Sequence, residues 1–286
     1  MGTGRWAAAA AVLVGGLAGF AADAPPAEAP APRAVYEVVR HKDIPYRTDK
    51  DADPERHKLD LYLPKGKANF PVLVFVHGGG WKSGNKSWYG SLGHSFAAEG
   101  IGTVVINYRL SPQVRHPGHI EDVAKAVAWV HDNIGRYGGR TDRLFVSGHS
   151  AGGHLVALLA TDPKYLAAEG RTPADIRGVV GISGVYQIYH DLLLFAPVFG
   201  RDKEECRLAS PVCHVGGKCP PFLLAYADHD YPQLDRQAED MHAGLTKCGC
   251  ATELLKVTDR NHFTIIINII DPADPLHRAV REFVTK

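Results

Sequence analysis

The sequence places a serine between glycines at a point where a predicted strand gives way to a predicted helix. Ser150 is the centre of the pentapeptide 148–152, Gly-His-Ser-Ala-Gly, which lies between the apolar runs 144–146 and 155–160. Flanking glycines allow a sharp turn in which the backbone leaves no room for larger side chains. A serine at the tip of such a turn exposes its hydroxyl, so the pattern predicts a nucleophile. The alternative interpretation is a glycine-rich helix start that Ser150 caps.

A second motif follows the apolar run 72–76. Residues 77–81 read His-Gly-Gly-Gly-Trp, and glycines leave the backbone N–H groups uncovered. We expect Gly79 and Gly80, together with the N–H of Ala151, to stabilise the oxyanion of a tetrahedral intermediate. A phosphate-binding loop is the alternative, but no Lys-Ser/Thr follows these glycines and their spacing is not Gly-x-Gly-x-x-Gly.

A serine hydroxyl needs a base to take its proton, and that base needs an orienting carboxylate. Both follow late predicted strands in the order acid, then histidine. Asp228 and Asp230 come after the apolar run 222–225, and His262 follows the next predicted strand. We favour Asp230 as the acid, with Asp228 as the nearer alternative and Asp235 as a remote one. Either of the first two aspartates could instead stabilise a turn.

Three further features are candidates for the walls of the site. Trp81 adjoins the glycine run and His149 precedes the serine, so both are candidate pocket residues. A structural role for Trp81 beneath the loop is equally open. Residues 188–217 are rich in apolar and aromatic side chains, which fits either a small cap over the pocket or an ordinary buried helix.

Alternating strands and helices are expected to position these groups. Residues 58–62 alternate polar and apolar side chains, as a strand with one solvated face does. Continuous apolar runs, typical of strands buried on both faces of a parallel sheet, occur at 72–76, 103–106, 144–146, 179–182 and 222–225. Helical apolar spacing occurs at 120–134, 233–245 and 275–284. The pattern predicts an α/β domain with a mostly parallel, doubly wound sheet flanked by helices.

The N-terminus differs from this pattern. Residues 1–24 contain Arg5, the uncharged apolar run 6–20 and then small residues, which is typical of a signal peptide. A short membrane anchor is the alternative, but spanning a bilayer takes roughly 20 apolar residues. We expect 25–34, rich in Pro and Ala, to be an extended tether and 35–286 to be the catalytic domain. The mature chain is then secreted or periplasmic, with no stable membrane insertion.

Composition excludes several other classes. The 286 residues include 32 Lys and Arg against 31 Asp and Glu, a net charge of +1, without the basic excess of nucleic-acid binders. The histidines are scattered and His-Glu-x-x-His is absent, so we expect no metal and no cofactor. In an exported chain we expect one or two disulfides that tie the region 206–219, with Cys248 or Cys250 as further partners. The five cysteines are Cys206, Cys213, Cys219, Cys248 and Cys250.

These motifs resemble the α/β-hydrolases, and within them the carboxylesterase group with a His-Gly-Gly-Gly oxyanion loop. The chain is similar to the feruloyl-esterase-like, kynurenine-formamidase-like and hormone-sensitive-lipase-like branches from about Leu59 to the C-terminus. The last branch usually has Asp where this chain has His149, whereas the first two often have Gly where it has Ala227. Gly80 favours an esterase over a formamidase. The matching stretches are 77–81, 107–110, 148–153 and 209–211.

The resemblance implies a serine hydrolase in which Ser150 forms an acyl-enzyme, His262 transfers protons and Asp230 holds the imidazole. It implies small-molecule substrates, namely short-chain or small aryl or carbohydrate-linked carboxylic esters. A formamidase or peptidase that uses the same residues is the alternative. A non-catalytic binding module on this fold is a third hypothesis, but it would be expected to have lost part of the triad.

Overall fold

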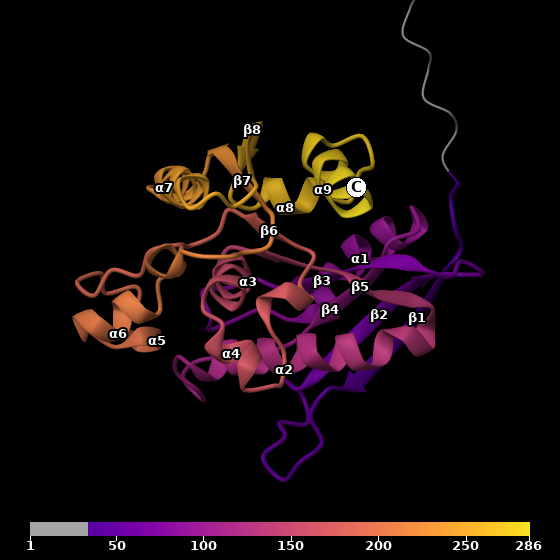
Figure 1. Ribbon diagram of the computed structural model, residues 1–286, viewed down its shortest axis with the longest axis horizontal. Helices are drawn as coiled ribbons and strands as arrows, with labels where there is room; N and C mark the ends of the chain where they lie inside the picture. The colour runs from indigo at the N-terminus through magenta and orange to yellow at the C-terminus, as the bar shows by residue number, and fades with distance from the viewer. Residues whose placement is uncertain (1–33) are drawn as a thin grey trace, which may run out of the picture. The chain divides into compact units, whose positions relative to one another are not determined.

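The computed structural model describes residues 34–286, and a single sheet of eight strands organises them (Figure 1). The strands are β1 (Val38–Pro45), β2 (Lys58–Pro64), β3 (Phe70–Val76), β4 (Gly102–Ile106), β5 (Gly139–His149), β6 (Gly178–Ile182), β7 (Phe222–His229) and β8 (Thr252–Asn261). Their order in the sheet is β1-β2-β4-β3-β5-β6-β7-β8. β1, β2 and β4 pair antiparallel, and every other pair is parallel.

Helices and short 3-10 turns connect the strands. The helices are α1 (Gly90–Ala98), α2 (Gly118–Asn133), α3 (Ala151–Thr161), α4 (Lys164–Ala167), α5 (Ala196–Phe199), α6 (Lys203–Leu208), α7 (Leu234–Lys247), α8 (Thr264–Asn268) and α9 (Pro275–Thr285). The 3-10 turns are η1 (Lys86–Tyr89), η2 (Ile134–Tyr137), η3 (Pro173–Asp175) and η4 (Pro211–His214). Every strand and helix predicted from apolar spacing is present, so the predicted fold class is confirmed.

The side chains of β3 show why the central strands read as continuous apolar runs. Val72, Val74 and Val76 pack into one buried cluster with residues of α2 and α3. Leu73 and Phe75 pack into a second cluster with residues of α1 and α9. Because successive side chains of a strand point to opposite faces, a sheet covered by helices on both faces needs apolar residues at every position. Figure 1 shows α2 and α9 on opposite sides of the sheet.

β1 is an edge strand that the apolar pattern did not predict. Most of its residues are exposed, and only its antiparallel pairing with β2 defines it as a strand. The residues predicted as a signal peptide, and nearly all of the predicted tether, lie outside the described range. Within residues 34–286 no helix combines the length and the apolar character that crossing a membrane requires.

One disulfide joins the segment before β7 to the segment before β8. Cys219 and Cys250 are bonded, with their Cα atoms 6.0 Å apart. Cys206 is a buried free thiol, and Cys213 and Cys248 are exposed free thiols. The prediction of one or two disulfides involving the region 206–219 is therefore confirmed with one bond, and Cys250 rather than Cys248 is the distant partner.

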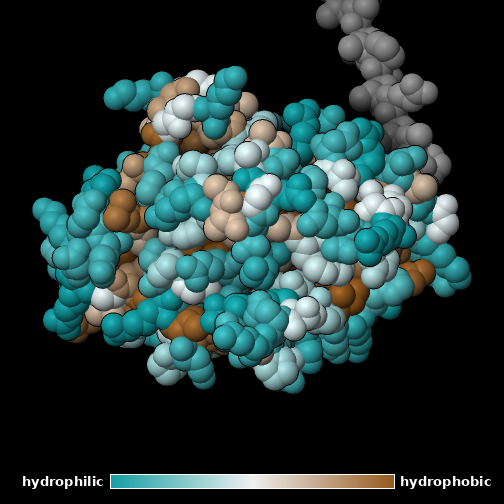
Figure 2. All heavy atoms as spheres, turned by 60° about the horizontal axis from the view of Figure 1, so that its bottom comes forward, coloured by the Kyte–Doolittle hydropathy of each residue, from teal (hydrophilic) through white to brown (hydrophobic). Residues whose placement is uncertain are grey.

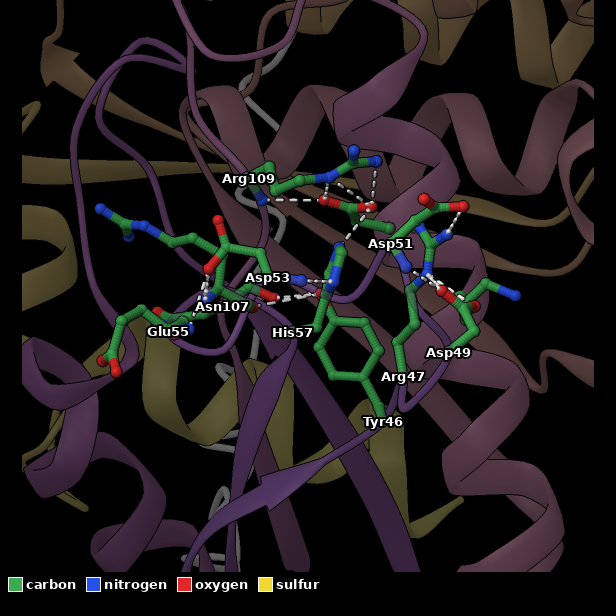
Figure 3. Close-up of polar contacts among 12 residues, drawn as sticks. Tyr46, Arg47, Asp49, Asp51, Asp53, Glu55, His57, Asn107 and Arg109 are labelled. Atoms are coloured by element: carbon green, nitrogen blue, oxygen red, sulfur yellow. Dashed lines mark hydrogen bonds and ion pairs between the residues drawn. The ribbon is translucent and has the colours of Figure 1, made fainter.

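A buried polar network fixes the segment that follows β4. The Asp122 carboxylate on α2 accepts hydrogen bonds from Arg109 Nη2 at 2.7 Å and from His57 Nε2 at 3.0 Å. The N–H of Asp53 donates to His57 Nδ1 at 2.7 Å, so the imidazole is satisfied on both nitrogens. Figure 3 shows Arg109 and His57 pointing toward the same carboxylate. The network thus joins the loop after β1 to α2.

We expect Asp122→Ala to lower the free energy of unfolding by about 3–5 kcal/mol, because it leaves the buried His57 and the partly buried Arg109 without their shared acceptor. Urea denaturation followed by circular dichroism measures the change. The control is Asp142→Ala, which removes the exposed partner of Arg140 and is expected to change the unfolding free energy little. Equal effects of the two substitutions would contradict the structural role of the network.

Candidate active site

Ser150 lies in a strained turn between β5 and α3. Its backbone has φ 55° and ψ −118°, and its N–H donates to Ile182 O at 2.9 Å. A Cβ on Gly148 would lie 2.3 Å from the backbone of Gly152, and one on Gly152 would lie 2.1 Å from Val76 O. Both positions therefore require glycine, and the predicted turn with the serine at its tip is present.

The structure brings together the three residues predicted as a catalytic triad. His262 Nε2 lies 3.0 Å from Ser150 Oγ, and His262 Nδ1 lies 2.7 Å from Asp230 Oδ1. A carboxylate only accepts hydrogen bonds, so Nδ1 carries the imidazole proton. The lone pair of Nε2 then faces the serine hydroxyl, which is the arrangement that a general base needs.

Asp230 is held by more than the histidine. Its Oδ2 accepts from Ser183 Oγ at 2.5 Å and from the N–H of Ala227 at 3.2 Å, and its Oδ1 accepts from the N–H of Tyr231 at 2.8 Å. Burial raises the pKa of Asp230, but the hydrogen bonds from His262 and Ser183 outweigh it and hold that pKa below its usual value. The carboxylate is therefore ionised at neutral pH.

Ser183 is not among the site residues that the sequence motifs predict. It follows β6, whereas Asp230 follows β7, and the two strands are parallel neighbours in the sheet. Their carboxyl ends therefore meet, which brings the two side chains together across 47 residues of sequence. A serine directly after the apolar run 179–182 was the only signal available.

Asp228 and Asp235, the two alternative acids, do not hydrogen-bond to His262. Asp228 accepts the N–H groups of Asp259 and Arg260, both at 3.0 Å, and so braces the turn at the end of β8. Asp235 lies in the first turn of α7 and is exposed. Of the three candidate aspartates, Asp230 is the one that hydrogen-bonds to His262.

Gly79 and Gly80 line the cleft that also contains Ser150. Their φ angles are 119° and 59°, and a Cβ on Gly79 would lie 2.2 Å from Ser83 O. In residues 34–286, outside the helices and strands, no backbone carbonyl accepts a hydrogen bond from the N–H of Gly79 or Gly80. Ala151 is the first residue of α3, so its N–H has no acceptor within the helix. All three N–H groups are thus available for an oxyanion.

The segment that follows β4, residues 107–111, holds this glycine loop in place through hydrogen bonds. The buried Tyr108 hydroxyl donates to His77 O at 3.1 Å, and the N–H of Ser111 donates to Trp81 O at 2.8 Å. Asn107 Oδ1 accepts the N–H of Lys86 at 2.6 Å, which fixes the start of η1. The loop that carries the candidate oxyanion donors is therefore anchored at both of its ends.

The cleft has a volume of about 850 Å³ and mostly apolar walls. The residues that line it are Gly78, Gly79, Gly80, Trp81, Ser83, Trp88, Tyr89, His149, Ser150, Val185, Tyr189, Leu192, Leu194, Phe195, Tyr231, Pro232, Gln233, Leu234, Gln237, His262, Phe263 and Ile266.

Trp81 and His149, the two candidate pocket residues, both reach the cleft, and both are also structural. Trp81 is buried, and its Nε1 donates to His154 Nδ1 at 3.2 Å. His149 Nε2 donates to the backbone carbonyl of His262 at 2.9 Å. Burial, and secondarily the neighbouring His262, lower the pKa of His149 to about 3, so this imidazole is neutral.

Residues 188–217 were expected to form either a cap over the pocket or a buried helix, and they have features of both. Phe195 and Phe199 are buried, with their rings 6.0 and 4.9 Å from the ring of Trp81. Leu192 and Leu194 line the cleft, and Leu193 is 71% exposed. The segment is therefore anchored by aromatic packing and forms one wall of the cleft.

Within residues 34–286 no group of three or more His, Cys, Asp or Glu side chains is arranged to hold a metal ion.

Comparison with known proteins gives one family and several relatives. The model of the BD-FAE family matches residues 59–245. Isoprenylcysteine alpha-carbonyl methylesterase ICME of Arabidopsis thaliana is 30% identical over 246 residues, covering 78% of this chain and 56% of the relative. Esterase LipC of Mycobacterium tuberculosis is 33% identical over 228 residues, covering 71% and 56%. The chain thus spans little more than half the length of these relatives.

A solved structure supports the fold. The truncated form of a carbohydrate esterase from gut microbiota superposes with a TM-score of 0.75 and covers 88% of this chain and 96% of the neighbour. The sequence identity is 21%, so this likeness concerns the fold.

We expect acid to destabilise the protein well above the pH at which carboxylates titrate. A histidine whose pKa in the folded chain lies below its unfolded value of about 6.5 stabilises the fold fully above pH 6.5. That stabilisation is lost as the pH falls toward the folded pKa. Burial gives such lowered pKa values, about 3 or about 4, to His77, His116, His119, His149 and His154.

Thermal unfolding followed by circular dichroism from pH 7.5 to pH 5 measures this effect, and the Tm should fall across the range. His149→Asn removes one titrating group, so the slope of unfolding free energy against pH should decrease by up to ~1.4 kcal/mol per pH unit. A Tm that does not change between pH 7.5 and pH 5 would contradict the neutral buried histidines.

Proposed function

The chain belongs to the BD-FAE family of α/β-hydrolases, and from this premise we propose that it hydrolyses carboxylic esters through an acyl-enzyme on Ser150. The observation that carries the proposal is the continuous hydrogen-bonded series from Ser150 Oγ to His262 (3.0 Å) and from His262 to Asp230 (2.7 Å). It lies in the wall of an apolar cleft beside uncovered backbone donors.

Acylation begins when Ser150 Oγ attacks the carbonyl carbon of the ester. His262 Nε2 takes the hydroxyl proton, and the ionised Asp230 stabilises the imidazolium that forms. The tetrahedral intermediate collapses, the bond to the alcohol oxygen breaks, and His262 returns the proton to that oxygen. Water then repeats the sequence on the acyl-enzyme and releases the carboxylic acid.

The negative charge of each intermediate develops on the former carbonyl oxygen. The N–H groups of Gly79, Gly80 and Ala151 are the donors available to it, and they are preorganised because the glycine loop is anchored by the segment after β4. One such donor typically contributes a factor of about 10²–10³ to kcat.

The chemistry of the relatives supports a small ester as the substrate. One relative is named as a methylesterase, a second as an esterase, and the structural neighbour as a carbohydrate esterase. We propose short-chain or small aryl or carbohydrate-linked carboxylic esters. Formamides and peptides, which the same triad could attack, are the alternative substrates that the assay below includes.

We expect Ser150→Ala to abolish turnover of p-nitrophenyl esters, a loss of about 10³-fold or more, because no other side chain replaces the nucleophile. Asp230→Asn should lower kcat by about 10³- to 10⁴-fold. The amide would donate to Nδ1 and move the imidazole proton to Nε2, which then could not accept from Ser150. Esters of increasing acyl length, a formyl amide and a peptidyl amide form the panel.

Asp228→Asn is the matched control, because Asp228 accepts backbone N–H groups from β8 and its carboxylate makes no hydrogen bond with His262. We expect it to retain most of the kcat of the unmodified protein. Unchanged ester turnover in Ser150→Ala would refute the mechanism. A larger loss in Asp228→Asn than in Asp230→Asn would refute the choice of acid, and faster amide than ester hydrolysis would favour the alternative substrates.

We also propose that the protein acts outside the cytoplasm. Two observations support this, namely the apolar, uncharged run 6–20 and the disulfide between Cys219 and Cys250. Disulfides persist mainly in oxidising compartments.

Expression in a secreting bacterial host, followed by intact-mass measurement, is expected to give an extracytoplasmic protein that lacks about the first 24 residues. A variant without residues 1–24 serves as the control and should stay in the cytoplasm. Recovery of the full-length chain in the cytoplasm, with its N-terminus intact, would contradict the proposal.

A further inference from the structure

Two aromatic side chains flank the imidazole of His262 inside the cleft. The Tyr231 ring stacks on it, with centroids 4.3 Å apart and an interplanar angle of 29°. The Phe263 ring meets it edge-on at 5.6 Å and 84°, and meets Tyr231 at 6.0 Å and 88°. Tyr231 follows β7 and Phe263 precedes α8, so two separate segments contribute to one aromatic corner beside the catalytic base.

These rings are exposed although they are large and apolar. Tyr231 is 51% and Phe263 is 58% exposed, and both line the cleft. On the face drawn in Figure 2, hydrophilic residues predominate and hydrophobic residues are scattered among them. The aromatic corner is therefore an apolar part of the cleft wall that stays exposed to solvent, at a place where a ligand can cover it.

The proposed chemistry determines which part of an ester lies there. His262 Nε2 delivers the proton to the alcohol oxygen, so that oxygen must come within about 3 Å of Nε2. The first carbon atoms of the alcohol group then lie beside the two rings that flank His262. The acyl group extends from the other side of the carbonyl carbon, away from the alcohol oxygen and therefore away from these two rings.

We propose that Tyr231 and Phe263 form an alcohol-side subsite that selects esters with an aromatic or comparably flat apolar alcohol group. The inference rests on the proposed ester hydrolysis and adds the chemical class of one half of the substrate. An aromatic alcohol group stacks on one ring and meets the edge of the other, the two arrangements that aromatic pairs prefer. A small polar alcohol group leaves both rings exposed to water.

The first test compares kcat/KM for benzyl acetate and 2-methoxyethyl acetate, which share the acyl group and release alcohols of similar acidity. The unmodified protein should prefer the benzyl ester. Phe263→Ala and Tyr231→Ala should each lower the ratio of the two kcat/KM values by about 3- to 10-fold. Tyr231→Phe keeps the ring and should keep the ratio. Because it is a ratio within one variant, partial misfolding cancels.

Two controls separate the subsite from general damage. Ile267 on α8 is 59% exposed and does not line the cleft, so Ile267→Ala should leave the ratio unchanged. The ratio of kcat/KM for benzyl butyrate and benzyl acetate reports on the acyl side of the cleft. It should not change in Phe263→Ala, because the acyl group extends from the carbonyl carbon away from the ring of Phe263.

The second test uses the reverse of acylation. An alcohol oxygen attacks the acyl carbon bound to Ser150 Oγ, its proton passes to His262, the bond to Oγ breaks, and Ser150 regains the proton from His262. With 2-methoxyethyl acetate as the acetyl donor, added benzyl alcohol should therefore compete with water for the acetyl group and form benzyl acetate. The fraction of acetyl groups transferred to benzyl alcohol should saturate as the benzyl alcohol concentration rises. Phe263→Ala should need a several-fold higher concentration for half of the maximal transfer.

The outcomes distinguish the two proposals. If the unmodified protein hydrolyses both acetates with equal kcat/KM, or if neither alanine variant changes the ratio, the subsite is refuted while ester hydrolysis stands. If Ser150→Ala hydrolyses the acetates as fast as the unmodified protein, the proposed function itself is refuted, and the subsite with it.

Discussion

The contact between two backbones organises the site. Gly152, in the first turn of α3, lies so close to the end of β3 that a single Cβ would come within 2.1 Å of Val76 O. This approach places the serine turn after β5 against the glycine loop after β3, two strands that are parallel neighbours in the sheet. Nucleophile and oxyanion donors can therefore face one carbonyl group only because Gly152 carries no side chain at the contact.

Charge in the site is confined to the atoms that the mechanism uses. Asp230 is ionised, since its hydrogen bonds with His262 and Ser183 outweigh the effect of burial on its pKa. His149, in contact with His262, is kept neutral by burial. Its Nε2 instead holds the backbone carbonyl of His262. The imidazole that moves protons is therefore positioned by a second imidazole that does not compete for them.

The aromatic walls of the cleft come from two sides, one beside the glycine loop and one beside His262. Trp81 and Phe195 belong to the side of the glycine loop, and their packing anchors the segment between β6 and β7. Tyr231 and Phe263 belong to the side of His262. Because the two sides come from different loops, acyl and alcohol preferences can vary independently on one scaffold.

The sequence by itself determined the buried strands of the sheet, several of the helices and the two glycine motifs, because apolar spacing and the space left by glycine are properties of neighbouring residues. It also gave the order of acid and histidine. Only the tertiary structure decided that Asp230 rather than Asp228 contacts His262, that Ser183 supports it, and that Cys219 pairs with Cys250. Those contacts form where the ends of parallel strands meet, between residues 31 or more positions apart, and local patterns carry no information about such distances.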